Sequence, residues 1–323
     1  MRTLVTGGAG YVGSVVAKQL LQAGHDVVVL DDLSRGHAAA IPEGAGHAAV
    51  SLTDPEALHG ALAGYDAVLH FAALALVAES VAFPERYWRN NVTGTLNLLD
   101  AMRANGVARL VFSSTCATYG EPERVPIVED EPTAPVNAYG ASKLAVDLML
   151  RDECAAHGLA ATSLRYFNVA GASGEQGEHH EPETHLIPLI LQAAAGRREH
   201  IKIFGTDYPT RDGTAVRDYI HIEDLGAAHL LALEHLTPGE HAVYNLGTGD
   251  GYTVREVIDA ARRVTGEAIE AVEEPRRAGD PPALVADPAR AREALGWRPE
   301  RSLEDMIADA WRWHRAHPDG YAD

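Results

Sequence analysis

Cysteine and lysine are scarce in this chain. Among 323 residues there are two cysteines, Cys116 and Cys154, and only three lysines. Two cysteines cannot build a disulfide framework, so we expect both to be small buried side chains. With 27 basic residues against 46 acidic ones, the formal net charge is −19. This charge argues against a nucleic-acid partner, because phosphate binding needs a concentrated basic face.

Long apolar runs are lacking as well. No run reaches the roughly 18 apolar residues needed to span a bilayer, and "MRTLVTGG" enters a strand-like run without a signal-peptide pattern. We therefore expect a soluble, cytoplasmic protein without a membrane partner.

Short apolar runs alternate with helical patterns in the first half of the chain. The runs at 3–6, 26–31, 67–72, 109–114 and 161–167 have strand length and few polar interruptions. Such runs are typical of strands buried on both faces. Segments of helical period, such as 11–24 and 91–106, lie between them and end at glycine. The alternation predicts an α/β fold with a Rossmann-type, doubly wound parallel sheet.

The pattern changes after about residue 170. A polar loop covers 171–185, and the later segments are less regular until a helical stretch near the C-terminus. We predict one domain over 1–170 and a smaller α/β domain over 171–323. Segments around 216–248 are expected to return to the first domain.

A glycine-rich turn follows the first predicted strand. In "TGGAGYVG", Gly7, Gly10 and Gly13 are spaced three apart, and Gly8 also completes a G-x-G-x-x-G pattern. The turn opens a predicted helix, and Asp31 stands at the end of the second predicted strand. In this context the glycines let the backbone approach a pyrophosphate, while the helix N-terminus supplies amide donors. The motif predicts a dinucleotide site.

The residues after the second strand favour one dinucleotide over the other. The Asp31 carboxylate can accept hydrogen bonds from both hydroxyls of a ribose. It would repel a 2′-phosphate, and Asp32 beside it adds to this repulsion. We therefore expect NAD rather than NADP.

Tyr139 and Lys143 lie four positions apart in "NAYGASKLAVD", which has the pattern of a helix. Residues at this spacing share one helical face and can address the same ligand. A phenol with a pKa of about 10 is a poor base at neutral pH, but an adjacent ammonium, helped by an oxidised nicotinamide, favours the phenolate. The compact ammonium can also bind ribose hydroxyls. The pair predicts a tyrosine base tuned by a lysine.

These motifs give the chain a family resemblance. Through T-G-x-x-G-x-x-G and Y-x-x-x-K it resembles the extended short-chain dehydrogenase/reductase family and, within it, the UDP-glucose 4-epimerases. The resemblance runs nearly end to end, and its most specific segments are "IFGTDYPTRDGTAVRDYIH" and "PRRAGDPPALVAD". It implies an enzyme that holds NAD, oxidises C4 of a UDP-sugar to a 4-keto form, and returns the hydride to the other face.

The resemblance also assigns roles to residues. Tyr139 is expected to take the proton of the 4-hydroxyl, Thr115 to hydrogen-bond that hydroxyl, and Lys143 to tune Tyr139 and hold the nicotinamide ribose. The expected NAD-binding residues are Gly7, Gly10, Tyr11, Val12, Gly13, Asp31, Asp32, Ser51, Phe71, Ala72, Ala73, Asn91, Ser113, Tyr139, Lys143 and Tyr166. The expected residues for the UDP-sugar are Thr115, Tyr139, Asn168, His185, Leu186, Phe204, Arg217, Arg277, Asp280 and Leu284. Under this assignment 1–170 binds NAD and 171–323 binds the nucleotide sugar.

Three positions depart from the family pattern. Ala75 stands where the family often has a lysine, Ser51 where an aspartate is common, and His185 where an asparagine is common. The first two changes bear on cofactor affinity and leave the reaction class unaltered.

The stretch "EHHEPETH" invites a metal interpretation, because His179, His180 and His185 stand near several glutamates. No helix is expected here to fix their geometry. We therefore interpret the stretch as a solvated acidic loop and predict no metal.

Other functions remain open at this point. A nucleotide-sugar 4,6-dehydratase begins with the same oxidation, but that family carries Asp and Glu directly after the active-site Thr, whereas Thr115 is followed by Cys116 and Ala117. A non-catalytic NAD-binding scaffold would be suggested by loss of Tyr139 or Lys143, and both are present. A UDP-N-acetylglucosamine epimerase also remains possible, since Leu284 is intermediate between the Tyr and the Cys or Ser of relatives with different substrate ranges.

The resemblance further implies a homodimer. Segments 91–105 and 139–157 correspond to helices that pair as a four-helix bundle in this family, and their apolar spacing is compatible with such pairing.

Overall fold

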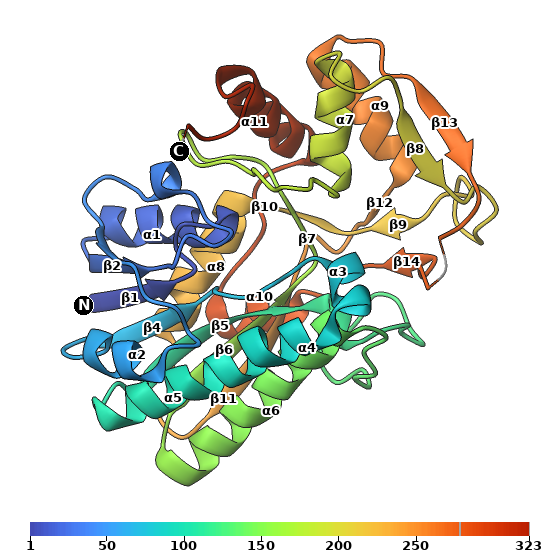
Figure 1. Ribbon diagram of the computed structural model, residues 1–323. Coiled ribbons are helices and arrows are strands. Elements are labelled where there is room, and N and C mark those ends of the chain that lie inside the picture. The colour runs from blue at the N-terminus through green and yellow to red at the C-terminus, as the bar shows by residue number, and fades with distance from the viewer. Residues whose placement is uncertain (278, 323) are drawn as a thin grey trace.

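A seven-stranded parallel sheet forms the centre of the protein (Figure 1), seen in a computed structural model that describes residues 1–277 and 279–322. The strand order is β11 (His241–Leu246), β6 (Ala160–Tyr166), β5 (Arg109–Thr115), β4 (Ala67–His70), β1 (Arg2–Thr6), β2 (Asp26–Leu30) and β3 (Gly46–Ala48). All neighbouring strands are parallel. The predicted doubly wound sheet is confirmed, and the order changes direction between β1 and β4, where such folds bind ligands.

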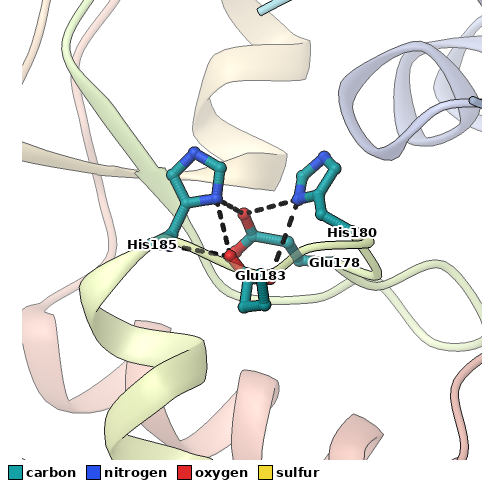
Figure 2. Close-up of side chains that lie close together, drawn as sticks. All are labelled: Glu178, His180, Glu183 and His185. Carbon is teal, nitrogen blue, oxygen red and sulfur yellow. Dashed lines mark hydrogen bonds and ion pairs between the residues drawn. The ribbon is translucent and has the colours of Figure 1, made fainter. Parts of the chain in front are cut away.

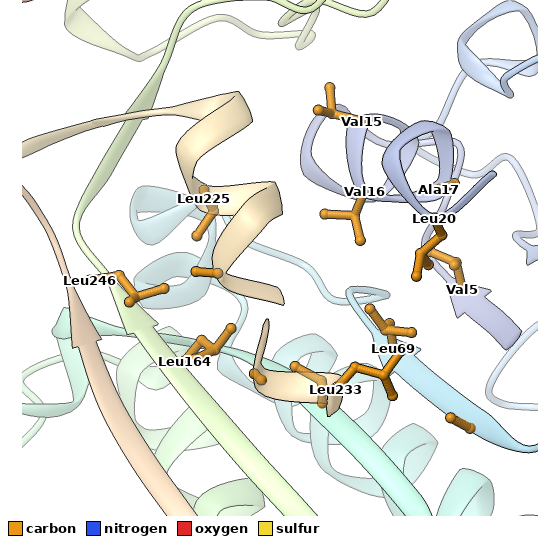
Figure 3. Packing of buried hydrophobic residues seen from close by; sticks show 14 of the residues in the cluster. Val5, Val15, Val16, Ala17, Leu20, Leu69, Leu164, Leu225, Leu233 and Leu246 are labelled. Carbon is orange, nitrogen blue, oxygen red and sulfur yellow. The ribbon is translucent and has the colours of Figure 1, made fainter. Parts of the chain in front are cut away.

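Neighbouring side chains on the strands pack against opposite faces of the sheet. On β1, Val5 belongs to one apolar cluster and Leu4 to another. The first face is covered by α1 (Tyr11–Gln22), α8 (Ile222–Glu234) and α10 (Ala289–Leu295). The second face is covered by α2 (Pro55–Ala61), α5 (Gly94–Ala104) and α6 (Ala138–His157). Figure 3 shows Val16 and Leu20 of α1 above the sheet, near Leu69 of β4. Burial on both faces explains why the strands read as continuous apolar runs.

A second group of elements lies beyond the carboxyl ends of the strands (Figure 1). Its helices α7 (Leu186–Ala194), α9 (Val254–Thr265) and α11 (Leu303–Ala316) pack together with the strand β8 (Ile201–Phe204). Three small sheets complete it: β8 with β13 (Ala271–Glu274), β7 (Asn168–Ala170) with β10 (Tyr219–His221), and β9 (Val216–Arg217) between β12 (Tyr252–Thr253) and β14 (Ala283–Leu284). The chain returns from this group to add β11 to the central sheet. The boundary at residue 170 stays a prediction.

Local sequence signals set several helix ends. Thr253 with Glu256, and Ser302 with Asp305, form capping boxes at the starts of α9 and α11. Gly158 follows α6 with a φ of 73°, a left-handed conformation that glycine adopts without strain. The predicted helix over 91–106 begins earlier than expected, because α3 (Val77–Ala82), α4 (Pro84–Tyr87) and a π-helical turn (Trp88–Thr93) lead into α5.

Two compositional expectations have different outcomes. Cys154 is buried, as expected, but Cys116 is only partly buried because it lies at a turn after β5. The expectation of two buried cysteines is therefore wrong for Cys116. Within 1–277 and 279–322, no helix has both the length and the apolar character required to cross a membrane.

Candidate functional site

The glycine turn joins β1 to α1 at the carboxyl edge of the sheet. Gly7 has a φ of 71°, and a Cβ there would lie 2.5 Å from the backbone nitrogen of Ala72. A Cβ on Gly13 would lie 2.2 Å from the carbonyl oxygen of Gly7. Glycine is thus required at both positions for the helix to start directly beside the strand. The first turn of α1 has neither a side-chain cap nor an acidic residue, so its amide groups and positive potential are suited to an anion.

Asp31 ties the second strand to this turn. Its Oδ2 accepts a hydrogen bond from the backbone N–H of Ala9 at 3.0 Å, and its Oδ1 accepts one from that of Leu33 at 2.9 Å. Burial raises the pKa of Asp31, while these hydrogen bonds oppose the shift. Nearby, Asp32 accepts a hydrogen bond from the N–H of Ser34, and Ser51 hydrogen-bonds Thr53. A helix N-terminus followed by a half-buried carboxylate is a donor and acceptor set that fits a dinucleotide.

The segment after β4 lies against the same turn. The N–H groups of Phe71 and Ala72 both donate to the carbonyl oxygen of Thr6, at 2.9 and 3.1 Å. Asn91, which we predicted to contact NAD, is fully buried, and its amide bonds the backbone of Leu74 and the hydroxyl of Ser142. Its side chain therefore holds the segment after Ala73 onto α6. On the other side, the hydroxyl of Tyr11 donates to the carbonyl oxygen of Gly171 at 2.7 Å, and Val12 packs into the core under α1.

Thr115 and Tyr139 meet where β5 ends and α6 begins. Thr115 is the last residue of β5, and its Oγ1 accepts from the N–H of Ala117 at 3.2 Å. Asn137 caps α6 by accepting from the N–H of Gly140 at 2.9 Å. A Cβ on Gly140 would lie 2.4 Å from the carbonyl oxygen of Ala117, so this glycine lets the two segments touch. Thr115 lies close enough to the phenol of Tyr139 to lower its pKa, against the larger effect of burial.

Lys143 lies on the same helix but its amine points to β5. Its Nζ donates to the carbonyl oxygen of Ser113 at 2.7 Å and lies 4.8 Å from the ring centre of Phe112. The hydroxyl of Ser113 is hydrogen-bonded to that of Tyr166. Burial lowers the pKa of Lys143 to about 7, against the opposing effect of Asp147. Ser113, Lys143 and Tyr166, all predicted to bind the cofactor, therefore lie together at the end of β5.

Burial raises the pKa of Tyr139, and the neighbouring side chain of Thr115 offsets only part of the shift. We predicted that the Lys143 ammonium, helped by an oxidised nicotinamide, would favour the phenolate. In the structure the amine of Lys143 donates to the carbonyl oxygen of Ser113. The tuning role of Lys143 stays a prediction.

The predicted sugar-nucleotide residues on β9 and β14 lie beside Thr115. Arg217 pairs in register with Leu284, and its Nη1 donates to the carbonyl oxygen of Pro281 at 3.0 Å. Leu284 packs with Cys116, the residue after Thr115, against a small apolar cluster. Burial raises the pKa of the Cys116 thiol to about 12, and the nearby guanidinium of Arg217 offsets part of this rise. Arg217, Leu284 and Cys116 therefore lie together next to Thr115.

The remaining predicted sugar-nucleotide residues lie farther along this group. The guanidinium of Arg277 stacks 3.8 Å from the ring centre of Phe204, and Asn168 begins β7, with its N–H donating to the carbonyl oxygen of Asp218. Asp280 follows Arg277 and accepts from Arg217.

Sequence reasoning missed Asp218. This fully buried carboxylate accepts from the N–H and hydroxyl of Thr248 at 2.8 and 2.7 Å, from the N–H of Gly249 and from that of Ala286. It joins β9, the turn after β11 and the segment after β14. Its only sequence signal is a polar residue between two short apolar runs, and this is too general to identify such a role.

The loop at 171–185 has neither helix nor strand, as expected, but it is not solvated. The side chains of Glu178 and Glu183 are only 7% and 8% exposed and face His180 and His185 (Figure 2). The interpretation as a solvated acidic loop is wrong, because the loop packs close to Tyr11 and His314, whose pKa values its glutamates influence.

His185 and Leu186 were predicted to face the substrate. The Nδ1 of His185 lies 2.9 Å from an oxygen of Glu178 and 2.9 Å from one of Glu183. Burial lowers the pKa of His185, but the two carboxylates outweigh burial and raise it to about 11. Leu186 begins α7 and packs against the cluster of α7, α9 and α11.

The comparisons with known proteins agree with this geometry. The model of the NAD dependent epimerase/dehydratase family matches residues 3–247. The chain belongs to this family. It is 57% identical to a UDP-glucose 4-epimerase of Streptomyces lividans, over 99% of this chain and 98% of the relative. It is 56% identical to one of Corynebacterium glutamicum, over 98% and 96% of the two chains.

Solved structures of the family superimpose along the whole chain. A crystal structure of UDP-glucose 4-epimerase aligns with a TM-score of 0.97 and 48% identity, covering 100% of both chains. Another, from Stenotrophomonas maltophila with bound NAD and formylated UDP-arabinopyranose, aligns with a TM-score of 0.95 and 40% identity, covering 98% and 99%. The predictions of the fold, of an enzyme, of the epimerase family and of NAD as its cofactor are confirmed.

Proposed function

We propose that this NAD-dependent epimerase interconverts UDP-galactose and UDP-glucose by reversible oxidation at C4. The observation that carries the proposal is the adjacent pair of Thr115 and Tyr139, with Lys143 one turn along α6. The pair lies at the carboxyl edge of the sheet, as do the glycine turn and Asp31. Full-length similarity to UDP-glucose 4-epimerases supports the choice of sugar.

The cofactor and the chain divide the chemistry between them. When bound, NAD would take a hydride from C4 of the sugar and later return it, so that the sugar passes through a 4-keto form. The glycine turn with the N-terminus of α1 is assigned to the pyrophosphate and Asp31 to the ribose hydroxyls. Lys143, Ser113 and Tyr166 are assigned to the nicotinamide side because they adjoin one another at the end of β5.

Proton transfer is the task of Tyr139. Its phenolate takes the proton of the 4-hydroxyl, and Thr115 holds that hydroxyl by a hydrogen bond. Because burial raises the pKa of the phenol, positive charge near it is needed for the phenolate to form at neutral pH. Lys143 is the cationic side chain on the same helical face, and its ammonium would supply this charge once its amine turns from the Ser113 carbonyl.

The acidic chain needs local cations to bind a diphosphate. Arg217 and Arg277 are the two guanidinium groups assigned to it, since arginine binds phosphate oxygens through forked hydrogen bonds. Phe204, Asn168, Asp280, His185 and Leu186 are assigned to the remainder of the UDP-sugar, and Leu284 to the sugar's C2 side.

The test is an assay with UDP-galactose and purified protein without added reductant. We expect UDP-glucose to form, and we expect acid denaturation of the protein to release NAD. A coupled UDP-glucose dehydrogenase reaction, started only after the epimerase has been removed, measures the product. Failure to form UDP-glucose by an NAD-loaded sample would contradict the proposal. Formation of a 4-keto-6-deoxy sugar would favour a dehydratase instead.

We also propose a homodimer in the cytoplasm, built on α5 and α6. The two helices lie side by side on one side of the molecule (Figure 1). Leu96 of α5, Leu148 of α6 and Trp88 of the π-helical turn are each more than two-fifths exposed. Apolar side chains gathered on neighbouring helices are typical of a protein interface.

A further inference from the structure

Four side chains of the loop that leads into α7 converge outside the residues assigned to proton transfer, and one of them, His185, is also assigned to the UDP-sugar. Glu178, His180, Glu183 and His185 each offer one ligand atom, and these four atoms all lie within 4.8 Å of one another. Figure 2 shows each imidazole turning one ring nitrogen toward the two carboxylates. From this convergence we propose that the four residues bind a divalent transition-metal ion of the zinc class.

The separations between imidazoles and carboxylates are near those of a tetrahedral site. With metal–ligand bonds of about 2.0–2.1 Å, neighbouring ligands of a tetrahedral ion lie roughly 3.3–3.4 Å apart. The Nδ1 of His180 lies 3.3 Å from an oxygen of Glu178 and 3.7 Å from one of Glu183. The Nδ1 of His185 lies 2.9 Å from an oxygen of Glu178 and 2.9 Å from Oε1 of Glu183, whereas His180 faces Oε2 of Glu183. The four ligand atoms lie within 4.8 Å of one another, so a turn of the Glu183 carboxylate and side-chain shifts on the order of an ångström would bring them around one ion.

The direction of His180 gives a second, independent observation. Its Nδ1 atom is buried and lies near both carboxylates, yet it makes no hydrogen bond of acceptable geometry to either. A nitrogen aimed between two carboxylates, rather than at an oxygen of one, is the arrangement of a ligand around a common centre.

The chemistry of the set selects the ion. Imidazole nitrogen and carboxylate oxygen together suit zinc, and two carboxylates balance the charge of a divalent cation in this partly buried place. All four positions of a tetrahedral ion are filled by protein, which is typical of a structural site rather than of a catalytic one. The ion would link Glu178 and His180 to His185, the residue before α7, and so position Leu186.

The experiment uses the full-length, NAD-carrying protein. After treatment with a chelator, the protein is titrated with zinc chloride, and bound metal is measured by mass spectrometry. We expect one zinc per chain, and X-ray absorption at the zinc edge should show two imidazoles with two oxygen ligands. No stoichiometric binding, or a spectrum without two imidazoles, would overturn the proposal and leave the cluster as a set of ion pairs.

Two glutamates in the same loop provide a matched comparison. Glu183→Gln removes a proposed ligand, whereas Glu181→Gln makes the same chemical change at a side chain that is 88% exposed. Zinc affinity should fall by more than about 100-fold in Glu183→Gln. Loss of a residue that only hydrogen-bonds a metal ligand already costs about 10- to 100-fold, and loss of the ligand itself should cost more. Zinc affinity should stay within about twofold of the wild type in Glu181→Gln. Zinc should likewise raise the Tm of the wild type and Glu181→Gln, but not of Glu183→Gln.

A second ligand variant keeps the test decisive if Glu183→Gln does not fold. His180→Gln removes a nitrogen ligand that holds no other hydrogen bond among the described residues. Its circular dichroism without zinc reports folding separately from metal binding. Wild-type zinc affinity in a folded His180→Gln or Glu183→Gln protein would refute the site.

Discussion

Arg217 on β9 donates through Nη2 to Oδ1 of Asp280 at 3.0 Å, although 63 positions separate the two residues. The contact holds a largely buried guanidinium near Thr115, where the diphosphate of the substrate is proposed to bind. Arg217→Met keeps much of the side-chain length but removes the charge. We expect KM for UDP-galactose to rise about 10- to 150-fold, equivalent to roughly 1.5–3 kcal/mol for a charged hydrogen-bonding group.

The matched control is Arg312→Met on the exposed side of α11. It should leave KM unchanged, and both variants should retain NAD. An Arg217→Met enzyme with the KM of the wild type would remove this residue from the substrate site.

Tyr139→Phe tests the proton-transfer step. The ring still fills its partly buried position, but the hydroxyl beside Thr115 is lost. We expect kcat to fall by about 10²- to 10⁴-fold, the usual contribution of a positioned acid or base. Bound NAD and Tm should change little. Turnover near that of the wild type would assign the proton transfer to another group.

The buried amine of Lys143 predicts a pH dependence of stability. Its pKa is lowered from 10.5 in the unfolded chain to about 7 by burial, so the unfolded state binds more protons between these values. The penalty for burying the ammonium is full below pH 7 and disappears as the pH rises toward 10.5. In protein freed of NAD, Lys143→Met should therefore be more stabilising at pH 6 than at pH 10, on the order of a few kcal/mol.

Urea unfolding of both proteins at the two pH values measures this difference. If the substitution were equally stabilising at pH 6 and pH 10, the lowered pKa of Lys143 would be refuted.

Leu284→Tyr tests selectivity for the substituent at C2. Leu284 packs with Cys116 beside Thr115, so a larger ring there would reduce the space near the sugar. We expect the wild type to favour UDP-glucose and UDP-galactose, with slow turnover of UDP-N-acetylglucosamine. Crowding of this kind costs about 1–3 kcal/mol, or roughly 10- to 200-fold in kcat/KM.

The comparison is made for both sugar pairs in both proteins. The Tyr variant should lose most of its N-acetyl activity and retain UDP-galactose activity. Equal efficiency of the wild type on both pairs would show that Leu284 does not limit substrate size.

Charge on the proposed dimer surface should produce monomers. Leu96→Asp combined with Leu148→Asp places two carboxylates on exposed sites of α5 and α6, where burial against a second copy would be costly. Sedimentation should give twice the 34.5 kDa chain mass for the wild type and a single chain for the variant. Val272→Asp on β13 is the control, since this valine is also exposed but lies on another part of the fold.

A wild-type monomer at micromolar concentration would reject the dimer. A dimeric double variant would move the interface away from these two helices.

Some of this structure could be predicted from short stretches of sequence, because the signals are local. Val5 and its neighbours form apolar runs because parallel strands are covered on both faces. Gly7 and Gly13 are needed where a strand turns at once into a helix, and this steric requirement appears as a fixed spacing. The spacing of Tyr139 and Lys143 follows from the helical repeat alone.

Tertiary packing decided the direction and the burial of side chains, which the spacing of residues in the sequence does not reveal. The helical repeat puts Lys143 on the face of Tyr139, but the position of β5 directs its amine to Ser113. Burial, which the spacing does not reveal, raises the pKa of the Tyr139 phenol. From the sequence we predicted that Glu178 and Glu183 are solvated, because polar loops usually lie at the surface. Packing against distant parts of the chain buries both side chains. Burial and side-chain direction depend on contacts between segments far apart in sequence, and these determine the charge state of a group and the partners it can bind.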